Sequence, residues 1–381
     1  MKHYDYIFTG AGLSALMTVN EMMQSGQFET KNLLLIDAEA KQSNDRTWCF
    51  WDTQEIGANL VHKKWDFAKF IDSTQVTLLN LSPYRYQMVT GQRFYETVFE
   101  EIKKHKNITF LQEKIIDFHE AENQCIVQTE KQSFTCHRIF NSIYKPEIVK
   151  QQNKYPVLQQ HFIGWFIKSK QAVFNPEQAT FMDFSVEQKG NTRFMYVLPT
   201  SANEALLEYT LFSHHHLKRE AYENEIQNYL QKLGVTEYEI TAKEQGSIPM
   251  TCYPFWKQNT KNVIHIGSAG GWTKASTGYT FKNTLKKSKR LIAFLQSGKD
   301  FRKFHKRNKF WFYDLLLLDI LDRKNEMGAT IFSSLFQKGS PTLIFKFLDE
   351  ETSFLEDLKV IWKCPKGLFI AALFRVVFRM K

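Results

Sequence analysis

A glycine motif between two apolar runs limits the folds that this chain can adopt. Tyr4–Thr9 reads as a short strand, and Gly10-Ala11-Gly12-Leu13-Ser14-Ala15 follows directly. Leu16–Ser25 then reads as a helix, and Asn32–Ile36 as a second, buried strand that ends at Asp37. A strand, a glycine-rich turn, a helix and a second strand within some thirty residues predict a βαβ unit of a nucleotide-binding fold.

The residue types in this turn match the needs of a bound pyrophosphate. Gly10 makes the tight turn, Gly12 lets the backbone approach the phosphates beside Ala11, and Ala15 is small enough for the helix to pack on the sheet. Asp37, 22 residues after Ala15, can accept hydrogen bonds from an adenosine ribose. The sequence therefore favours a dinucleotide site, with a purely structural glycine turn as the alternative.

A second glycine-rich loop follows the strand-like run Val263–Ile266. We expect a helix to begin near Thr277 or Gly278, as in another strand–loop–helix unit. Two such loops about 250 residues apart favour FAD over NAD, because the longer FAD molecule needs contacts from distant parts of a chain. An ordinary glycine-rich connection is the alternative. The loop reads Gly267-Ser268-Ala269-Gly270-Gly271.

The patterns along the chain predict an α/β protein with four segments. A Rossmann-type FAD-binding domain takes residues 1–150 and resumes at 251–299, as in the flavoprotein hydroxylases, and Asp45–Trp51 reads as an aromatic, charged loop within it. Residues 151–250 form an antiparallel substrate domain, and 300–381 form a helical, basic C-terminal region. The substrate-domain strands are expected at Phe162–Ile167, Ala179–Phe184, Arg193–Leu198 and Leu206–Phe212.

The distribution of charged residues and cysteines indicates which kind of partner and which compartment to expect for the protein. The segment 274–309 holds twelve Lys or Arg residues and one acid, Asp300, so it predicts an anionic partner, with a solvated basic helix face as the alternative. No nucleic-acid-binding motif accompanies it. The five scattered cysteines favour a reducing cytoplasm, and no apolar run is long enough to predict a spanning helix. No metal site is expected, because neighbouring histidines such as those at 214–216 cannot all face one ion.

Two carboxylates interrupt apolar strand patterns. Glu208 lies within Leu206–Leu211, and Asp183 lies within Phe181–Phe184. If the face that carries Glu208 is internal, burial raises the pKa of its carboxyl group, which can then act as a general acid or base. Alternation alone does not tell which face is internal, and a solvent-facing position for either acid is the other interpretation.

Several segments in one order give the chain a family resemblance. It resembles the bacterial FAD-dependent lycopene cyclases, distant relatives of the plant lycopene β- and ε-cyclases, over roughly residues 3–350. In the plant enzymes an acidic Leu-Glu-Glu-Thr signature corresponds to Leu207–Thr210 (LEYT), which places the essential acid at Glu208 and a tyrosine at the second acid. Ala275 stands where relatives often have proline. Besides the N-terminal motif, the segments are Asp45–Trp51 (DRTWCFW), Gln160–Trp165 (QHFIGW), Met182–Phe184, Arg193–Pro199, Ile248–Met250 and Gly267–Tyr279.

The resemblance implies that the protein converts lycopene to β-carotene through γ-carotene. Protonation of a terminal double bond gives a carbocation, the ring closes, and a proton leaves, without net redox change. Reduced FAD would stabilise the positive charge, and NADPH would serve to reduce the FAD. Glu208 would handle protons, the cofactor would contact Asp37, Arg46 and both glycine loops, and the substrate would contact Trp48, Asp183 and Tyr209.

The implied substrate is a membrane-soluble hydrocarbon, so we expect a cytoplasmic protein bound peripherally to the anionic inner face of the cell membrane. The 33 Phe, 15 Tyr and 8 Trp residues are numerous enough to line an apolar cavity as well as a core. Two other functions fit the same features. They are an FAD-dependent monooxygenase or prenyl-chain reductase, and a non-catalytic lipid-binding or escort protein on the same scaffold.

Overall fold

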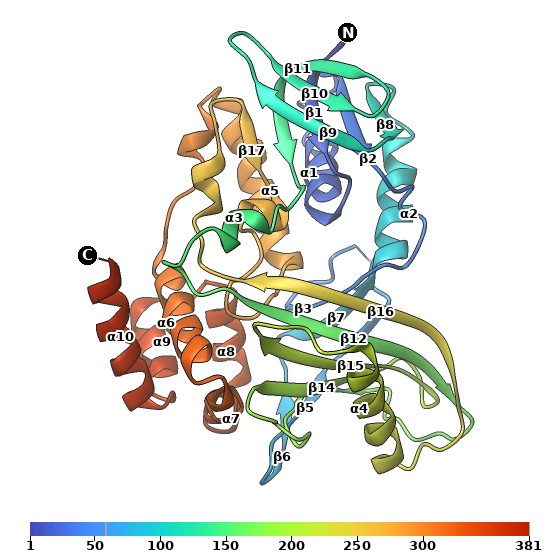
Figure 1. Cartoon of the computed structure of the whole chain (residues 1–381). Helices are drawn as coiled ribbons and strands as arrows, with labels where there is room; N and C mark the ends of the chain where they lie inside the picture. Colours follow the sequence, from blue (N-terminus) through green and yellow to red (C-terminus); the bar gives the residue numbers. More distant parts are fainter. Residues whose placement is uncertain (58, 381) are drawn as a thin grey trace.

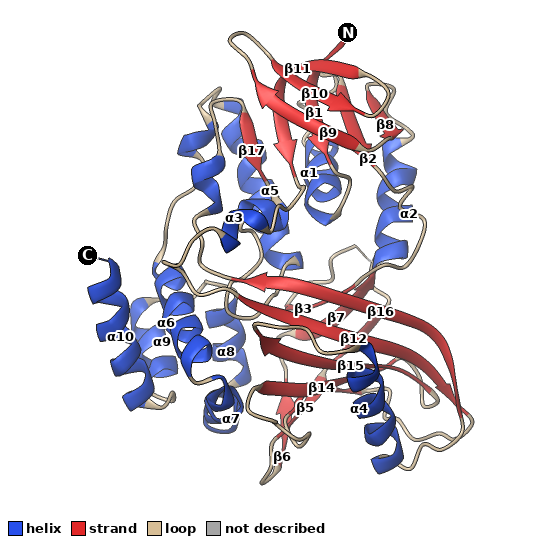
Figure 2. Ribbon diagram, in the orientation of Figure 1, coloured by secondary structure: helices blue, strands red, loops and turns tan. Residues whose placement is uncertain are grey.

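The computed structural model describes residues 1–57 and 59–380. It contains two seven-stranded sheets and one three-stranded sheet, and the helices gather beside them (Figure 2). The N-terminus lies at the first sheet, and the last five helices pack together beside the second sheet (Figure 1). Among the described residues, no helix is both long and apolar enough to cross a bilayer.

The first sheet has the order β8-β2-β1-β11-β10-β9, with β17 also paired to β11. Its central strands are parallel, and β9 and β10 add an antiparallel edge. Four consecutive leucine and isoleucine residues of β2 are buried, as expected of a parallel strand covered on both faces. The strands are β1 (Lys2–Thr9), β2 (Leu33–Asp37), β8 (Ile108–Gln112), β9 (Ile115–Glu120), β10 (Cys125–Thr129), β11 (Ser133–Asn141) and β17 (Val263–His265).

Helices cover one face of this sheet. One of them, α1 (Leu13–Gln24), begins at the edge of the sheet (Figure 1). The observed α1 begins three residues before the predicted Leu16, because Gly12 is its N-cap. The covering helices also include α2 (Gly91–Ile102) and α5 (Phe281–Gln296). The prediction that α5 begins near Thr277 or Gly278 was wrong. The backbone at Gly278 is left-handed (φ +73°), a conformation that a helix cannot contain.

The second sheet has the order β16-β12-β15-β14-β13-β5-β6. It is antiparallel except for the parallel pair β13–β5. The helix α4 (Arg219–Lys232) packs on one face, and the C-terminal helices cover part of the other. The strands are β5 (Phe67–Ile71), β6 (Val76–Asn80), β12 (Leu158–Ser169), β13 (Gln178–Asp183), β14 (Thr192–Pro199), β15 (Glu204–Ser213) and β16 (Tyr238–Met250).

The four substrate-domain strands that the sequence predicted correspond to β12–β15. Two features differ from the expected arrangement. The strands β5 and β6 lie in the second sheet, although their residues fall within the segment 1–150 assigned to the cofactor domain. Asp45–Trp51, predicted as a loop, instead contains most of β3 (Thr47–Asp52), which pairs with β7 (Arg85–Thr90) beside β4 (Lys63–Trp65). Backbone pairing with a strand some forty residues away decides this conformation, and local sequence does not report it.

The region after residue 300 is helical, as predicted. Its helices contribute Leu315, Phe332 and Phe345 to the core that also contains the inner face of the second sheet. Short 3-10 turns η1–η4 and the helical turn α3 (Glu147–Lys150) complete the fold. The helices are α6 (Lys309–Arg323), α7 (Gly328–Lys338), α8 (Pro341–Leu348), α9 (Phe354–Ile361) and α10 (Lys366–Met380), and the turns are Phe255–Gln258, Gly267–Gly270, Phe301–Lys303 and Asn325–Met327.

Candidate active site

A cavity of about 550 Å³ lies between the first and second sheets; we call it the central cavity. The loops after β1, β2 and β11 line one end, and β12, β14, β15 and β16 line the other. The strands β3 and β7 and the loop 267–281 close its sides. This volume lies within the usual range of ligand and cofactor sites.

The first glycine motif forms one end of the central cavity. The backbone of Gly10 is left-handed (φ +100°), and a Cβ atom there would lie 2.2 Å from Oγ of Ser142. Gly12 is the N-cap of α1, and a Cβ atom there would meet nothing within 4 Å, so the space beside it is open. No side chain caps this helix terminus. Free N–H groups and the helix dipole therefore meet the cavity, an arrangement that binds phosphate.

The predicted neighbours of this motif lie in different environments. The Ala11 N–H donates a hydrogen bond to Oδ2 of Asp37 (2.7 Å), and Asp37 lines the central cavity. Ala15 does not line it, because its methyl group is fully buried in the core under α1. Arg46 and Trp48 both line the cavity, from β3 and the residue before it. Arg46 lies 3.7 Å from the carboxylate of Asp45.

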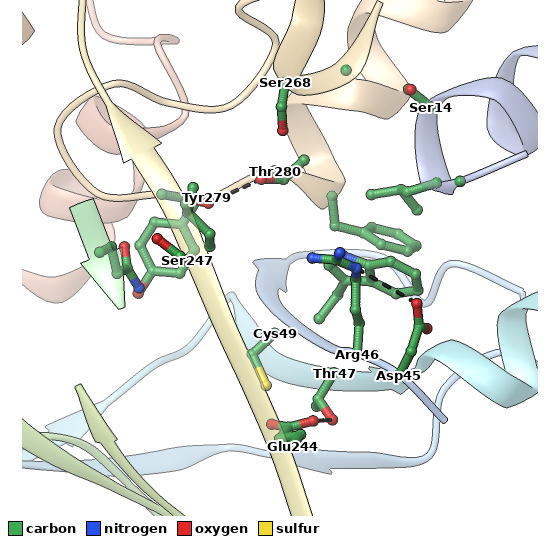
Figure 3. A pocket seen from close by; sticks show the side chains of 18 of the residues that line it. Ser14, Asp45, Arg46, Thr47, Cys49, Glu244, Ser247, Ser268, Tyr279 and Thr280 are labelled. Carbon is green, nitrogen blue, oxygen red and sulfur yellow. Dashed lines mark hydrogen bonds and ion pairs between the residues drawn. The ribbon is translucent and has the colours of Figure 1, made fainter. Parts of the chain in front are cut away.

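The second glycine loop meets the cavity through its first two residues only. Gly267 is left-handed (φ +58°), and a Cβ atom there would lie 2.5 Å from Oγ of Ser14, so this loop closely approaches the start of α1. Gly267 and Ser268 line the central cavity (Figure 3). Ala269, Gly270 and Gly271, which the sequence analysis also assigned to the cofactor, do not line the central cavity. The 3-10 turn rotates them away.

Several polar atoms of the cavity wall lack partners within the described chain. They are buried, and unsatisfied buried polar atoms are rare in folded proteins. All four belong to residues that line the central cavity, so a polar ligand is the natural partner for them. The atoms are Oδ1 of Asp45, Oε1 of Gln160, Oε1 of Glu244 and Oγ1 of Thr277. The open cradle at Gly12 and these atoms together fit a long polar cofactor such as FAD.

A carboxylate pair lies on the second sheet at the other end of the cavity. Glu208 of β15 and Glu244 of β16 both pair with Gly164 of the intervening strand β12. Thr210 donates a hydrogen bond to Oε1 of Glu208 (2.6 Å), and Thr47 donates one to Oε2 of Glu244 (2.7 Å; Figure 3). Both acids line the central cavity. The interpretation of Glu208 as a solvent-facing residue was therefore wrong.

Burial raises the pKa of both carboxyl groups. For Glu208 the negative charge of Glu244 adds to the increase, and the hydrogen bond from Thr210 opposes it. For Glu244 the hydrogen bond from Thr47 and the charge of Arg46 oppose it. Two neighbouring carboxylates in a site of low polarity cannot both ionise easily. The pair therefore retains a proton to a higher pH than an ordinary carboxyl group.

Aromatic hydroxyl groups surround this pair. Tyr196 of β14 lies directly opposite Glu208 in the sheet. Burial raises the pKa of Tyr196 and Tyr86 far above the ordinary value, and Tyr279 contacts both hydroxyl groups. All three rings line the central cavity, beside the Cys49 thiol. Neutral phenol groups and ring faces thus lie next to an acid that can hold a proton.

The other two predicted substrate contacts, Asp183 and Tyr209, lie outside the lining of the central cavity. Asp183 is 3% exposed and accepts hydrogen bonds from the Tyr229 hydroxyl (2.6 Å) and the Ser185 N–H (2.8 Å). Tyr209 neighbours Glu208 in a strand, so its side chain points to the opposite face, where Arg193 donates to its hydroxyl (3.3 Å). In this structure both side chains take part in the packing of the second sheet.

Glu244 was missed by the sequence reasoning. It follows Lys243 in a strand whose residues are mostly exposed, so its apolar neighbours give no signal. The glycine in the QHFIGW segment was the available clue, because Gly164 creates the space that Glu244 occupies. A Cβ atom at Gly164 would lie 3.1 Å from Cγ of Glu244. Within the described residues, no group of three His, Cys, Asp or Glu side chains forms a metal site.

Several solved structures share this fold, and one of them holds FAD. A geranylgeranyl bacteriochlorophyll reductase-like protein from Thermoplasma acidophilum superposes with a TM-score of 0.62 at 10% identity, covering 99% of this chain and 100% of that one. A variant of the halogenase PltM in complex with FAD gives a TM-score of 0.56 at 11% identity, covering 90% and 78%. These likenesses confirm the predicted FAD-binding flavoprotein fold.

Sequence comparison is more specific. A lycopene beta-cyclase from Pantoea ananas is 26% identical over 304 residues, which cover 76% of this chain and 74% of that protein. Residues 5–375 match the family described as lycopene cyclase protein. The match spans both ends of the central cavity and most of the C-terminal helices. The chain therefore belongs to the lycopene cyclase family.

Proposed function

We propose that the protein is a lycopene β-cyclase that converts lycopene to β-carotene through γ-carotene. One observation carries the proposal: the carboxyl pair Glu208–Glu244 lines the same cavity as the dinucleotide cradle at Gly12. The reaction is an isomerisation. A proton adds to a terminal double bond, the resulting tertiary carbocation is attacked by a neighbouring double bond to close the ring, and a ring proton leaves. Proton gain and loss balance, so no net redox change occurs.

Glu208 delivers or accepts the proton at the end group of the substrate. Its raised pKa lets it hold a proton near neutral pH, and Glu244 restores that proton through the shared site. The faces of Tyr196 and Tyr279 stabilise the positive carbon, as aromatic faces stabilise other cations. The apolar walls, among them Phe162 and Leu206, exclude water that would trap the cation.

The same proposal assigns FAD to the other end of the cavity. The N-terminus of α1 would hold its pyrophosphate, Asp37 its ribose, and Gly267 would allow close approach. Bound there in its reduced form, FAD would supply negative charge near the carbocation, and NADPH is the proposed reductant. The open space at Gly12 and the unpartnered polar atoms of the wall support this assignment.

We also assign the protein to the cytoplasmic face of an anionic membrane, from which it takes its substrate. The basic stretch is less available than the sequence indicated, because Lys274, Lys282 and Lys309 form ion pairs inside the protein. The apolar side chains of α9 and α10 are better suited to enter the lipid surface. The exposed ones are Phe354, Leu355, Leu358, Trp362, Ile370, Leu373, Phe374, Val377 and Phe378.

The test is expression in cells that accumulate lycopene, with pigments identified by chromatography. We expect β-carotene from the natural sequence and uncyclised lycopene from Glu208→Gln, with flavin still bound. Glu204→Gln, an acid of the same strand that pairs with Lys168 near the surface, is the matched control and should behave as the natural sequence. Oxygenated or more saturated pigments would instead identify a monooxygenase or a reductase. Retention of cyclisation in Glu208→Gln would contradict the assigned role.

A further inference from the structure

A second cavity of about 310 Å³ lies on the other side of the second glycine loop from the central cavity; we call it the basic cavity. Gly271, which does not line the central cavity, lines this one. Its walls come from 251–256 and 271–275, from α5, from 304–308, from the start of α6 and from the loop after α8. The proposed reaction uses none of these residues.

The carboxylates of the basic cavity all form ion pairs, but with fewer lysines than there are acids. Its four acids pair with three lysines, because Lys274 pairs with both Asp314 and Glu350, so these groups together leave one negative charge. The pairs are Asp314–Lys274 (3.0 Å), Glu350–Lys274 (3.4 Å), Asp349–Lys282 (2.6 Å) and Glu351–Lys286 (2.6 Å). These contacts account for the acidic side of the wall.

Four further cations of the wall form no ion pair within the described chain. The Lys287 ammonium group donates to the carbonyl oxygen of Gly271 (2.9 Å), and Arg290 donates to a carbonyl oxygen in the 304–308 segment. Arg307 lies over the rings of Trp256 (5.4 Å) and Trp311 (4.4 Å), and Lys306 is exposed at the rim. These four cations outnumber the one carboxylate charge that the three lysines leave uncompensated, so the cavity has an excess of positive charge.

The environment of His305 reflects this excess of positive charge in the basic cavity. Its ring stacks on Trp256 with centroids 3.7 Å apart, and its buried Nε2 atom has no partner in the described residues. Burial and the charges of Lys287, Arg290 and Arg307 lower the pKa of His305 to about 4. Burial also lowers the pKa of Lys287 to about 8; the charge of Glu350 opposes this decrease, and the charge of Arg290 adds to it. A bound anion would relieve the repulsion at both groups and give Nε2 a partner.

We propose that the basic cavity is a binding site for a phosphate group. A phosphate accepts several charge-assisted hydrogen bonds at once, which matches the unpaired lysine and arginine donors. The group can belong to a soluble phosphate compound or to an anionic phospholipid. The proposed membrane-facing helix α9 lies next to this cavity, because Lys309, directly after the 304–308 segment, contacts Thr352 and Asp357 at the start of α9.

The experiment measures binding to the purified full-length chain by calorimetry and by tryptophan fluorescence, with two probes. One is inorganic phosphate, and the other is vesicles of phosphatidylcholine with or without phosphatidylglycerol. Arg307→Gln removes an exposed cation of the cavity, so the protein should still fold. Lys303→Gln removes an exposed cation four residues earlier that does not line the cavity, and is the matched control.

We expect Arg307→Gln to weaken phosphate binding at least about ten-fold, the loss expected for one charge-assisted contact, and Lys303→Gln to change it little. We also expect phosphate to raise the pKa of His305, followed by NMR. If phosphate alone does not bind, but Arg307→Gln selectively reduces binding to phosphatidylglycerol vesicles, the source is a lipid headgroup. If Arg307→Gln and Lys303→Gln behave alike with both probes, the site does not exist. None of these results depends on cyclase activity.

Discussion

Glu208 and Glu244 lie on either side of Gly164, and each pairs with that glycine across a different edge of β12. Each acid is therefore a cross-strand neighbour of Gly164, on the same face of the sheet, and no side chain at 164 stands between them. The missing side chain at Gly164 gives Glu244 room beside Leu206 and next to Glu208, because a Cβ atom there would lie 3.0 Å from Cδ1 of Leu206. Two acids thereby share one buried site, which raises the pKa of both.

The first prediction concerns the dependence of stability on pH. The folded state raises both carboxyl pKa values, so it keeps protons that the unfolded chain releases near the ordinary value of about 4.3. The pair therefore stabilises the protein fully below that pH, and this contribution is lost as pH rises through the folded pKa values. Glu244→Gln should reduce the loss between pH 5 and 8 by about 1 to 3 kcal/mol, measured by urea unfolding. Glu239→Gln, exposed on the same strand, should leave the pH dependence unchanged.

The second prediction concerns the space at Gly164. Gly164→Ala places a methyl group against Leu206 and Glu244, which should lower the free energy of unfolding by about 1 to 3 kcal/mol. Gly164→Ala should also lower cyclisation, because Glu244 must move away from Glu208. Activity per bound flavin and chemical denaturation measure the two effects. Gly367→Ala is the control. A Cβ atom there meets nothing within 4 Å, so this change should lower neither the free energy of unfolding nor cyclisation. An active, fully stable Gly164→Ala protein would contradict the packing argument.

The third prediction separates the two glycines of the first motif. Gly12→Val should fold normally, because the backbone there is extended and a Cβ atom would have open space. Its side chain would enter the cradle, so flavin absorbance of the purified protein should fall at least about ten-fold. Gly10→Ala should instead lower stability by about 1 to 3 kcal/mol, because the left-handed backbone and Ser142 both oppose a side chain. Equal flavin content in Gly12→Val would argue against a phosphate cradle at this position.

The fourth prediction concerns Asp183, which the sequence analysis placed at the substrate. Asp183→Ala leaves the buried Tyr229 hydroxyl without its acceptor, so unfolding should become easier by about 1 to 3 kcal/mol. The pigments formed by the folded fraction should be unchanged. Thermal unfolding and pigment chromatography measure these outcomes. Lost cyclisation in a stable, flavin-bound variant would return Asp183 to the active site.

The fifth prediction concerns the exposed apolar side chains of α9 and of Trp362, the residue directly after it. Leu355 and Trp362 are each 71% exposed, so replacing both with aspartate should not disturb the core. Co-sedimentation with lipid vesicles should fall at least about ten-fold, because the change removes buried apolar area at the lipid surface and adds charge. Leu78→Asp, a 59% exposed position on β6, is the matched control. If all these proteins sediment equally, α9 is not the membrane-binding surface.

The sequence alone determined the features that depend on neighbouring residues. The turn after Thr9 needs glycine at position 10 because its backbone is left-handed, and Asp37 ends the next strand beside that turn. These requirements are local, so a short stretch of sequence reports them. The strands β12–β15 were also predicted, since each contains a short, largely apolar stretch rich in aromatic and aliphatic residues. Alternation put Leu206 and Glu208 on one face of β15, as observed, since both line the central cavity.

The tertiary structure decided which face of each strand is internal and which distant residues meet. Alternation has the same form for either face, so only packing against the rest of the chain places Glu208 in the cavity and Tyr209 away from it. Glu244 reaches Glu208 through the register of three strands, and strand register depends on contacts between residues far apart in sequence. The ion pairs of the basic stretch also depend on the tertiary structure. Its partners, among them Asp314, Asp349 and Asp357, come from later segments of the chain that fold back onto it.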